Sequence, residues 1–339
     1  MRIIQLFEGD FNGVLKYILG RKLMWHITKN KVVDADTYGS RIGKTATEAI
    51  LNLQLIFDNC RIWKRNFGMI FNDADGCYDR IPPVLADIAL RRLGCLEMVV
   101  RAHTVAQKQM KHYVKTGDGV SKGYIKNSKK IDSTIAFGII LLLTGPIGGV
   151  GQGGGASPII WLAILLMMLQ VYKKRNEGIT IINRISQQIV KYWVISYVDD
   201  NTIVRSFENS CSEKNMLKEL RKNLLHWNEI LTMTGGGLSL EKCKVSIMKW
   251  KPDFWGRHSC DGHSSNESIL IKTKESGENI FKLQRLQPDQ AEHVLGIRLP
   301  MNGIMMQEYN YRLQQINELA LTLYKLPFTP RDAAMIYQT

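Results

Sequence analysis

The sequence predicts an α+β fold, in which helices pack behind a small antiparallel sheet. Helical runs and short β-branched runs intermix along the chain, without the steady alternation that builds a parallel α/β sheet. Of the 339 residues, 45% are hydrophobic and 22% are charged, which is ordinary for a globular chain with a sizeable core.

The expected helices have apolar side chains three or four residues apart, or apolar side chains on every face. Thr45 or Thr47 is expected to cap the first helix, and Gly94 to end the second. The third is apolar on all sides and should be buried. In chain order the helices cover residues 47–60, 82–94, 159–172, 213–233 and 313–323.

The expected strands are short and rich in β-branched and aromatic residues. Two of them flank the adjacent acids Asp199 and Asp200 and so predict a hairpin with two carboxylates at its tip. Like charges on neighbouring residues repel, so this arrangement favours a bound cation. The strands cover residues 68–71, 192–197, 202–205, 243–248, 268–272 and 280–286.

The charge balance indicates the kind of partner. The formal net charge is +14 and the pI about 9.4. This favours a nucleic acid partner first and an anionic membrane second, with a solvated basic surface as the equal alternative. The oily runs 135–149 and 159–172 are shorter than the roughly 20 residues of a membrane span, so no membrane partner is expected. Six cysteines without a CxxC pair, and no visible signal peptide, predict an intracellular protein, nuclear or cytoplasmic.

A second acidic run, "NDADGCYDRI", follows the strand at 68–71 and holds Asp73, Asp75 and Asp79. A strand ending in Asp73 beside the Asp199 hairpin would gather three or more carboxylates at one sheet edge. Hard divalent cations prefer such oxygen ligands, and two of them can clamp a phosphoryl transfer. The alternative is that Asp73 and Asp79 cap the helix that follows.

The stretch "GPIGGVGQGGGASPIIW" is a glycine-rich loop that enters a helix. Such a loop lets the backbone approach a nucleotide closely, and a helix N-terminus favours anions. It lacks the lysine of a P-loop. Gln152 is placed to hydrogen-bond a sugar or base, unless the segment is simply a loop.

Together, "NDADGCYDRI", "GQGGGASP" and "YVDDN" resemble, in this order, the reverse transcriptases of non-LTR retrotransposons and group II introns. The nearer likeness is to a eukaryotic branch of retroelement-derived reverse transcriptase domain proteins. Further similar motifs at 3–12, 38–50, 235–247 and 293–299 extend the resemblance over nearly the whole chain. It implies a right-hand polymerase: fingers at 1–72, a palm at 73–298 with an insertion at 252–290, and a truncated thumb at 299–339.

The resemblance implies a role for the acids. Asp73 and Asp199 would be the principal ligands of two Mg²⁺ ions, with Mn²⁺ as the possible substitute, and Asp200 would complete the cluster. Tyr78 would lie under the incoming sugar and select dNTPs over rNTPs.

Other residues would bind the nucleotide. Gln152 would contact the sugar of the dNTP, and Arg41 and Lys44 its triphosphate. Lys242 would donate a proton to the departing pyrophosphate, with Lys244 as the rival. The implied partners are an RNA template, a DNA primer and dNTPs, and the sequence leaves protein partners unknown.

The predicted function is therefore an RNA-directed DNA polymerase core, a nucleotidyltransferase that extends a primer 3′-hydroxyl. The alternative is a catalytically inactive, nucleic-acid-binding remnant of the same fold. It is suggested by Gly151, where many relatives have proline, and by the extra negative charge of Asp75. An RNA-directed RNA polymerase is a third possibility, which the aromatic ring of Tyr78 disfavours.

Overall fold

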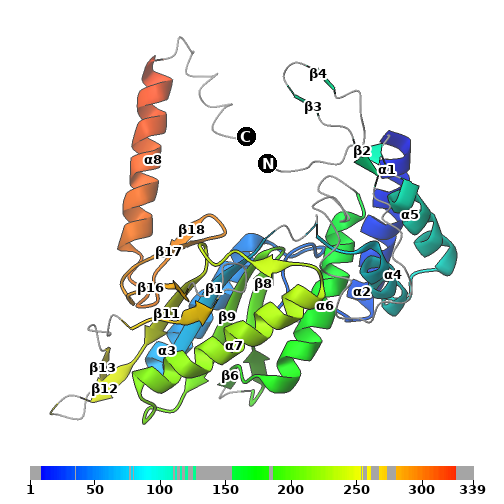
Figure 1. The fold of residues 1–339 in the computed structure, drawn as a ribbon. Coiled ribbons are helices and arrows are strands. Elements are labelled where there is room, and N and C mark those ends of the chain that lie inside the picture. The colour runs from blue at the N-terminus through cyan, green and yellow to red at the C-terminus, as the bar shows by residue number, and fades with distance from the viewer. Residues whose placement is uncertain are drawn as a thin grey trace.

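The computed structural model describes residues 9–34, 36–75, 78, 80–109, 111–112, 115–116, 119–120, 125–126, 155–182, 186–252, 254, 258–260, 267–272 and 280–325. Helices and a sheet share one body, so the expected mixed α+β architecture is confirmed (Figure 1). The boundaries predicted at 72 and 298 stay predictions.

The helices agree with the predicted runs and add others. The helices α3, α4, α6, α7 and α8 correspond to the predicted runs, whereas α1, η1, α2 and α5 were not predicted. Their bounds are α1 Gly9–Leu15, η1 Lys16–Leu23, α2 Met24–Lys29, α3 Ala46–Ile62, α4 Pro83–Arg92, α5 Glu97–Gln109, α6 Ser157–Arg175, α7 Glu213–Met233 and α8 Met306–Lys325.

The central sheet has the strand order β16-β11-β1-β9-β8, and β10 pairs with the far end of β1. The prediction of a purely antiparallel sheet was wrong in one place, because β16 runs parallel to β11. The chain between these two strands forms other two-stranded sheets before it returns to the central sheet. A connection of this kind allows β16 to run in either direction relative to β11. The strands are β1 Asn66–Asp75, β8 Val194–Tyr197, β9 Asp200–Phe207, β10 Gly237–Leu238, β11 Lys244–Met248 and β16 Gln284–Leu286.

The remaining strands form two-stranded sheets outside the central sheet: β2 with β5, β3 with β4, β6 with β7, β12 with β13, β14 with β15 and β17 with β18. Their bounds are β2 Lys111–His112, β3 Lys115–Thr116, β4 Gly119–Val120, β5 Ile125–Lys126, β6 Ile179–Ile182, β7 Ile189–Tyr192, β12 Trp250–Pro252, β13 His258–Cys260, β14 Leu270–Lys272, β15 Ile280–Lys282, β17 Glu292–Val294 and β18 Ile297–Leu299.

Two predicted strands are each split in the structure. The run 192–197 breaks at Trp193, so that β7 pairs with β6 while β8 pairs with β9. The run 280–286 breaks at Leu283, so that β15 pairs with β14 while β16 pairs with β11. Neither run contains a Gly, Pro, Asn or Asp residue that would signal a break, and the change of partner therefore left no mark in the pattern.

The strand β1 is buried on both faces, which positions its acidic end. Phe67, Met69 and Phe71 pack in the core that contains α3, and Ile70 packs in the core of α6 and α7. In Figure 1, α3 lies on the other side of the sheet from α6 and α7. This alternation follows the two-residue period of a strand.

Local signals set the helix ends. Of the two expected capping residues, Thr45 caps α3, and it forms a capping box with Glu48. Ser212 caps α7 through the Asn215 amide. Gly94 follows α4 with a φ of +79°, as expected of a glycine that ends a helix.

The apolar helix α6 is a core helix. Among the described residues it is long and apolar enough to cross a membrane, yet 67% of that stretch is buried inside the protein. Twelve of its residues belong to the buried set, from Ser157 to Tyr172. Such burial makes length and composition weak evidence for a membrane span.

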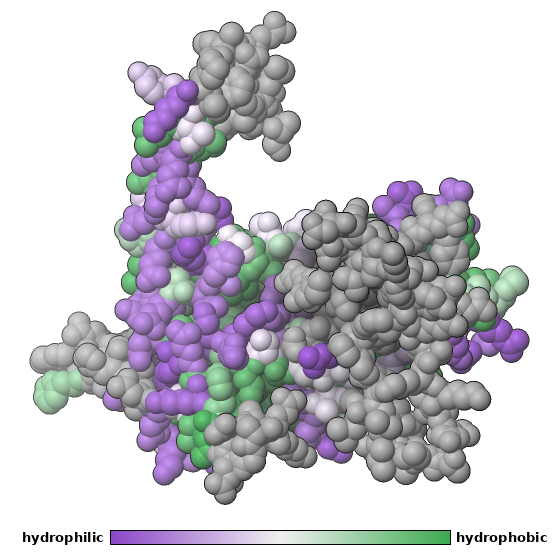
Figure 2. Space-filling view, turned by 45° about the horizontal axis from the view of Figure 1, so that its top comes forward, coloured by the Kyte–Doolittle hydropathy of each residue, from purple (hydrophilic) through white to green (hydrophobic). Residues whose placement is uncertain are grey.

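In contrast, α8 projects from the body (Figure 2). Its base is fixed by Glu308, whose carboxylate accepts hydrogen bonds from the Arg298 amide at 2.7 Å and from Arg312 Nε at 2.6 Å. Arg312 also donates to the Gly296 carbonyl. The orientation of α8 is therefore set by the hairpin of β17 and β18.

Candidate functional site

The structure brings the two acidic runs together at one edge of the sheet. In the antiparallel register of β1 and β9, Asp73 lies directly opposite Asp200. Tyr197 pairs with Asp200, which makes Val198 and Asp199 a two-residue hairpin turn. The sequence-predicted meeting of the "NDADG" acid with the paired acids is thus found in the structure.

The turn that carries Asp199 has a strained backbone. Val198 has a φ of +61°, which a β-branched residue rarely adopts. Trp161, on α6, donates its indole N–H to the Val198 carbonyl at 2.6 Å. Such strain persists only where the surroundings over-determine it, and it is concentrated at functional sites.

A loop from the N-terminal part holds the other side of this turn. Ser196 donates its amide to the Asp36 carbonyl and accepts from the Tyr38 amide, both at 2.9 Å. The next residue, Gly39, lies so close that a Cβ there would be 2.3 Å from the Val198 nitrogen. The segment 36–39 therefore extends the sheet beyond β8 and fixes the turn.

The acids concentrate negative charge. Burial, then Asp199, then Asp73 raise the pKa of Asp200 to about 6, while Lys242 and His293 oppose the rise. Lys242 Nζ lies 2.5 Å from Asp73 Oδ2. His293 belongs to β17, so the β17–β18 hairpin contributes to the field at this edge.

The rival lysine Lys244 is committed elsewhere. Its ammonium pairs with the Glu292 carboxylate at 2.8 Å. Lys242 precedes β11 and reaches Asp73, whereas Lys244, two residues later, reaches the hairpin. The geometry separates the two candidates, and the proton-donor role of Lys242 stays a prediction.

The edge has the donor chemistry of a divalent-cation site. Within the described ranges, no three His, Cys, Asp or Glu side chains already form a metal-binding group. Asp73 nevertheless holds the ammonium of Lys242, and the neighbouring acids raise the pKa of Asp200. Both observations indicate a negative electrostatic potential at this edge, which a bound cation would neutralise. Carboxylate oxygens are the donors that Mg²⁺ prefers, so the residues present fit such an ion.

Tyr78 is linked to the acidic turn through one aromatic ring. Its ring centroid lies 6.2 Å from that of Trp161, the residue that binds the Val198 carbonyl. Gln152 and the neighbouring loop residues 151–154 lie outside the described residues. Gly155, where the described chain resumes, donates its amide to Asn12 Oδ1 at 2.6 Å.

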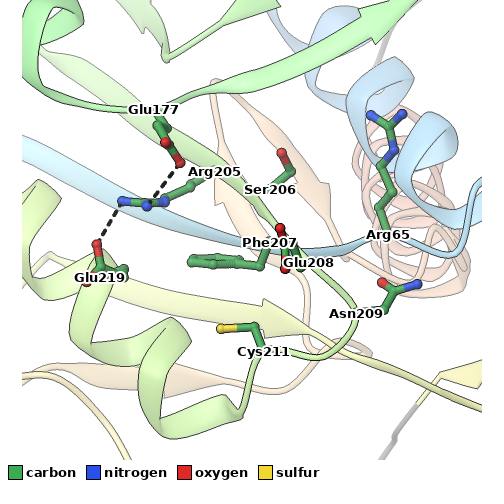
Figure 3. A pocket seen from close by; sticks show the side chains of 9 residues that line it. All are labelled: Arg65, Glu177, Arg205, Ser206, Phe207, Glu208, Asn209, Cys211 and Glu219. Carbon is green, nitrogen blue, oxygen red and sulfur yellow. Dashed lines mark hydrogen bonds and ion pairs between the residues drawn. The ribbon is translucent and has the colours of Figure 1, made fainter.

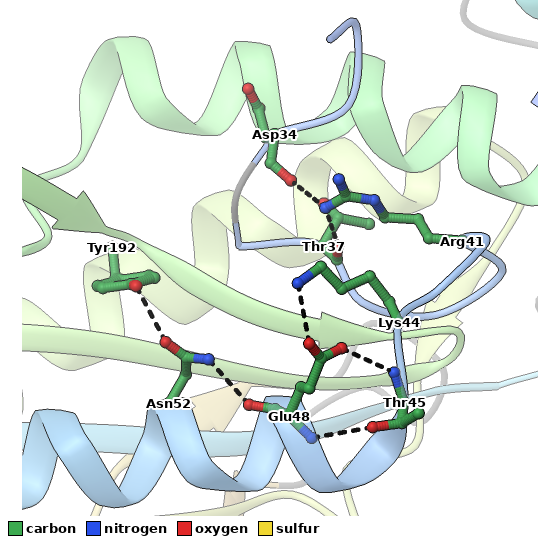
Figure 4. Close-up of polar contacts among 8 residues, drawn as sticks. All are labelled: Asp34, Thr37, Arg41, Lys44, Thr45, Glu48, Asn52 and Tyr192. Carbon is green, nitrogen blue, oxygen red and sulfur yellow. Dashed lines mark hydrogen bonds and ion pairs between the residues drawn. The ribbon is translucent and has the colours of Figure 1, made fainter. Parts of the chain in front are cut away.

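Arg41 and Lys44 lie in the loop that follows this edge segment (Figure 4). Arg41 Nη1 donates to the carbonyls of Asp34 and Thr37 at 3.0 and 2.7 Å. Lys44 pairs with Glu48 at 3.1 Å. Arg41 is held by carbonyls of the preceding chain and Lys44 by a carboxylate of α3, and their predicted contact with a triphosphate stays a prediction.

Sequence reasoning missed Trp161 and Gly39. Trp161 lies in a run that is apolar on all sides, where an aromatic residue predicts only core packing. Gly39 has no left-handed φ and no turn signature of its own. Neither has a local signal, because the function of each depends on Val198, which is far away in the sequence.

A hollow of about 670 Å³ lies at the other end of β1 and β9 from the acids (Figure 3). Arg205 crosses it and pairs with Glu177 at 3.2 Å and Glu219 at 3.3 Å. The arginine is also within 5.4 Å of the Phe207 ring centroid. Because these lining residues pair with one another, we interpret the hollow as part of a structural ion-pair network.

The similarity of this chain to known proteins is limited to the fold. No protein-family profile matches the chain, and no curated protein sequence matches it. Solved structures of telomerase from Candida tropicalis do match. One, apo and truncated from the C-terminal domain, is 12% identical with a TM-score of 0.43 and covers 80% of this chain and 45% of that chain.

Another, in complex with the TWJ fragment of telomeric RNA, is 13% identical with a TM-score of 0.45 and covers 77% of this chain and 36% of that chain. Telomerase from Candida albicans with the same fragment is 13% identical with a TM-score of 0.40, and covers 70% and 35%. This chain thus spans less than half the length of the telomerases it matches.

Proposed function

We propose that the chain is the catalytic core of an RNA-directed DNA polymerase with a right-hand arrangement of fingers, palm and thumb. The observation that carries the proposal is the register of β1 and β9, which sets Asp73 opposite Asp200 next to the Asp199 turn. The motif resemblance supplies the reaction class, and the net charge of +14 suits template and primer.

The acids would hold the ions. Asp73, Asp199 and Asp200 are the proposed ligands of two Mg²⁺ ions, or of Mn²⁺. When bound, such ions lower the pKa of the primer 3′-oxygen and neutralise the triphosphate. Phosphoryl transfer needs mainly positioning and charge neutralisation from the protein, which agrees with a turn held from both sides.

The cation Lys242 would change partner during the reaction. It contacts Asp73 in the structure, and its exposed side chain allows it to turn toward a bound triphosphate. There it would donate a proton to the departing pyrophosphate. Arg41 and Lys44 would bind the same phosphates, and Gln152 the sugar.

Tyr78 would select the sugar. Its ring lies beside the Trp161 ring at an interplanar angle of 52° and so is positioned by the same side chain as the acidic turn. An aromatic ring beneath C2′ excludes a 2′-hydroxyl by contact. Tyr78→Ala should therefore increase rNTP incorporation relative to dNTP incorporation, and unchanged discrimination would remove this role.

Primer extension on an RNA template with dNTPs and Mg²⁺ tests the proposal. The protein should extend the primer, and Asp199→Asn should reduce the rate at least about 100-fold, as loss of charge stabilisation does at other sites. The matched control is Asp289→Asn, an exposed acid in the turn before β17, which should leave the rate unchanged.

The same assay separates the alternative function. If a well-folded protein adds no nucleotide, but binds primer–template in a salt-sensitive way that Asp199→Asn does not weaken, the chain is a nucleic-acid-binding remnant of the fold. Preference for rNTPs would instead indicate an RNA-directed RNA polymerase.

A further inference from the structure

The first helices, α1, η1 and α2, have two opposite faces with the same spacing. Leu15, Leu19, Leu23 and Ile27 repeat every four residues and are buried in the core of α6 and α7. Offset by two residues, a second row contains Tyr17, Arg21, Trp25 and Lys29, and every member is exposed. An offset of two residues places the second row on the far side of the helix from the first.

This outer row, together with Lys22, is named here the outer basic face. Tyr17 is 53% exposed and Trp25 is 58% exposed, large values for aromatic side chains. Single exposed aromatic residues need no explanation, but two on one helical face, among cations, form a pattern.

The charge of the segment is one-sided. Between residues 9 and 33 the sequence has Asp10 as its acid, against five basic residues: Lys16, Arg21, Lys22, Lys29 and Lys31. Elsewhere on the protein, exposed cations such as Arg101 and Lys222 pair with nearby carboxylates. Within the part of the chain that the structure describes, the five basic residues form no ion pair with an acid.

Each ring of the outer basic face has an ammonium group over it. Lys22 Nζ lies 5.1 Å from the Tyr17 ring centroid, and Lys29 Nζ lies 4.7 Å from that of Trp25. These distances are within the range of a cation–π contact. A stacking surface next to a phosphate-binding cation therefore occurs twice, at positions eight residues apart.

We propose that the outer basic face binds single-stranded nucleic acid, with bases stacked on Tyr17 and Trp25 and phosphates bound by Arg21, Lys22 and Lys29. Base–aromatic stacking combined with a basic track is the general mode of single-strand binding. Tyr17 lies in η1, which is a π-helix, and Trp25 lies in the first turn of α2. The two rings are therefore about two helical turns apart, on the order of 10 Å along the axis, so they engage two different nucleotides of one strand.

A membrane surface fits this face less well. An interfacial helix inserts a continuous apolar face, but the apolar row of this helix is buried in the protein core. On the outer basic face itself, the apolar surface consists of the two separate rings, each with a cation over it. The repeated pairing of a ring with an ammonium group favours a chain that alternates flat bases with phosphates.

Binding of a fluorescent 12-nucleotide oligouridine RNA to the full chain, followed by anisotropy without Mg²⁺ or primer, tests the proposal. Trp25→Ala should weaken binding about fivefold or more, the effect of losing one stacked base, and Trp25→Phe should restore most of it. The double variant Lys22→Gln/Lys29→Gln should reduce the salt slope by about 1.4, for two phosphate contacts with a single strand.

The matched charge control is Lys218→Gln/Arg221→Gln, which removes two exposed cations of α7 and should change binding little. All variants are also made with Asp199→Asn. That change abolishes polymerisation under the proposed function and alters no residue of the outer basic face, so failure of either proposal is seen separately. Thermal unfolding checks that each variant is folded.

A second measurement locates the strand. RNA with 5-iodouridine, irradiated on the wild-type protein, should crosslink to Tyr17 or Trp25, as mass spectrometry would show. Absence of this crosslink, or equal RNA affinity of Trp25→Ala and the wild type, would overturn the proposal. Binding to vesicles of phosphatidylcholine with 30% phosphatidylserine that is lost in Trp25→Ala, without an effect on RNA, would assign the face to a membrane instead.

Discussion

Replacing Gly39 by alanine tests whether the acidic turn depends on close packing with the 36–39 segment. A Cβ at this position would lie 2.3 Å from the Val198 nitrogen and 2.9 Å from the Tyr197 carbonyl carbon. Ordinary contacts begin at 3.4 Å, so the two backbones must separate by about 1 Å. A third atom, Val198 Cγ2, would lie 2.8 Å away. The other two atoms belong to the main chain, so no side-chain rotation relieves their overlap.

Two effects of different size follow. Overpacking of this kind costs typically 1–3 kcal/mol in the free energy of unfolding, which for a chain of this size is a fall in Tm of about 2 °C per kcal/mol. Asp199 directly follows Val198, so it moves with the turn. A displacement of about 1 Å at a catalytic group costs about 100-fold in rate, and we expect primer extension to fall by about that factor.

The matched control is Gly13→Ala, on α1. A Cβ there meets nothing within 4 Å, and alanine is the better helix former by up to about 1 kcal/mol. This variant should be as stable as the wild type or slightly more so, with full activity. Equal stability and equal extension rates for Gly39→Ala and Gly13→Ala would refute the argument that segment 36–39 positions the acids.

Three further predictions concern other parts of the fold. Glu308→Gln weakens charge-assisted hydrogen bonds that fix the base of α8, each worth about 1.5–3 kcal/mol, and should speed amide exchange in α8; unchanged exchange would contradict the anchoring. Burial lowers the pKa of His103, so the unfolded state binds a proton first, and folding stability should fall as pH drops below about 6.5; urea midpoints at pH 7.5 and 5.5 should differ less for His103→Leu than for the wild type. Lys244→Met leaves the half-buried Glu292 uncompensated and should destabilise the protein by more than Arg101→Met, which breaks an exposed pair worth about 1 kcal/mol or less; equal urea midpoints would exclude a role for Lys244 in holding the hairpin.

The sequence predicted elements with a local cause. The capping box at Thr45, the glycine stop at Gly94 and the amphipathic pattern of α7 were all visible as spacing. The hairpin around Asp199 was visible as two β-branched runs that flank acids. Such signals act between residues a few positions apart, so they can be recognised from the sequence alone.

The breaks at Trp193 and Leu283 had no local cause. Each interrupts a run that is suited to a strand over its whole length. The chain changes partner there because the residues before and after the break pair with different strands. The parallel pairing of β16 with β11 has the same origin. Strand pairing is a choice among distant segments, which spacing within one segment does not determine.

By itself, the sequence determined that this chain has two acidic runs at strand ends, a basic surface and the helices that bury its core. Only the tertiary structure decided that Asp73 lies opposite Asp200, that Lys242 rather than Lys244 reaches them, and that Gly39 and Trp161 hold the turn. Local backbone preferences and hydrophobic spacing reach over one or two turns of chain. Register, ion-pair choice and close backbone contact arise only when distant segments pack together, from 37 residues apart for Trp161 and Val198 to 169 for Asp73 and Lys242.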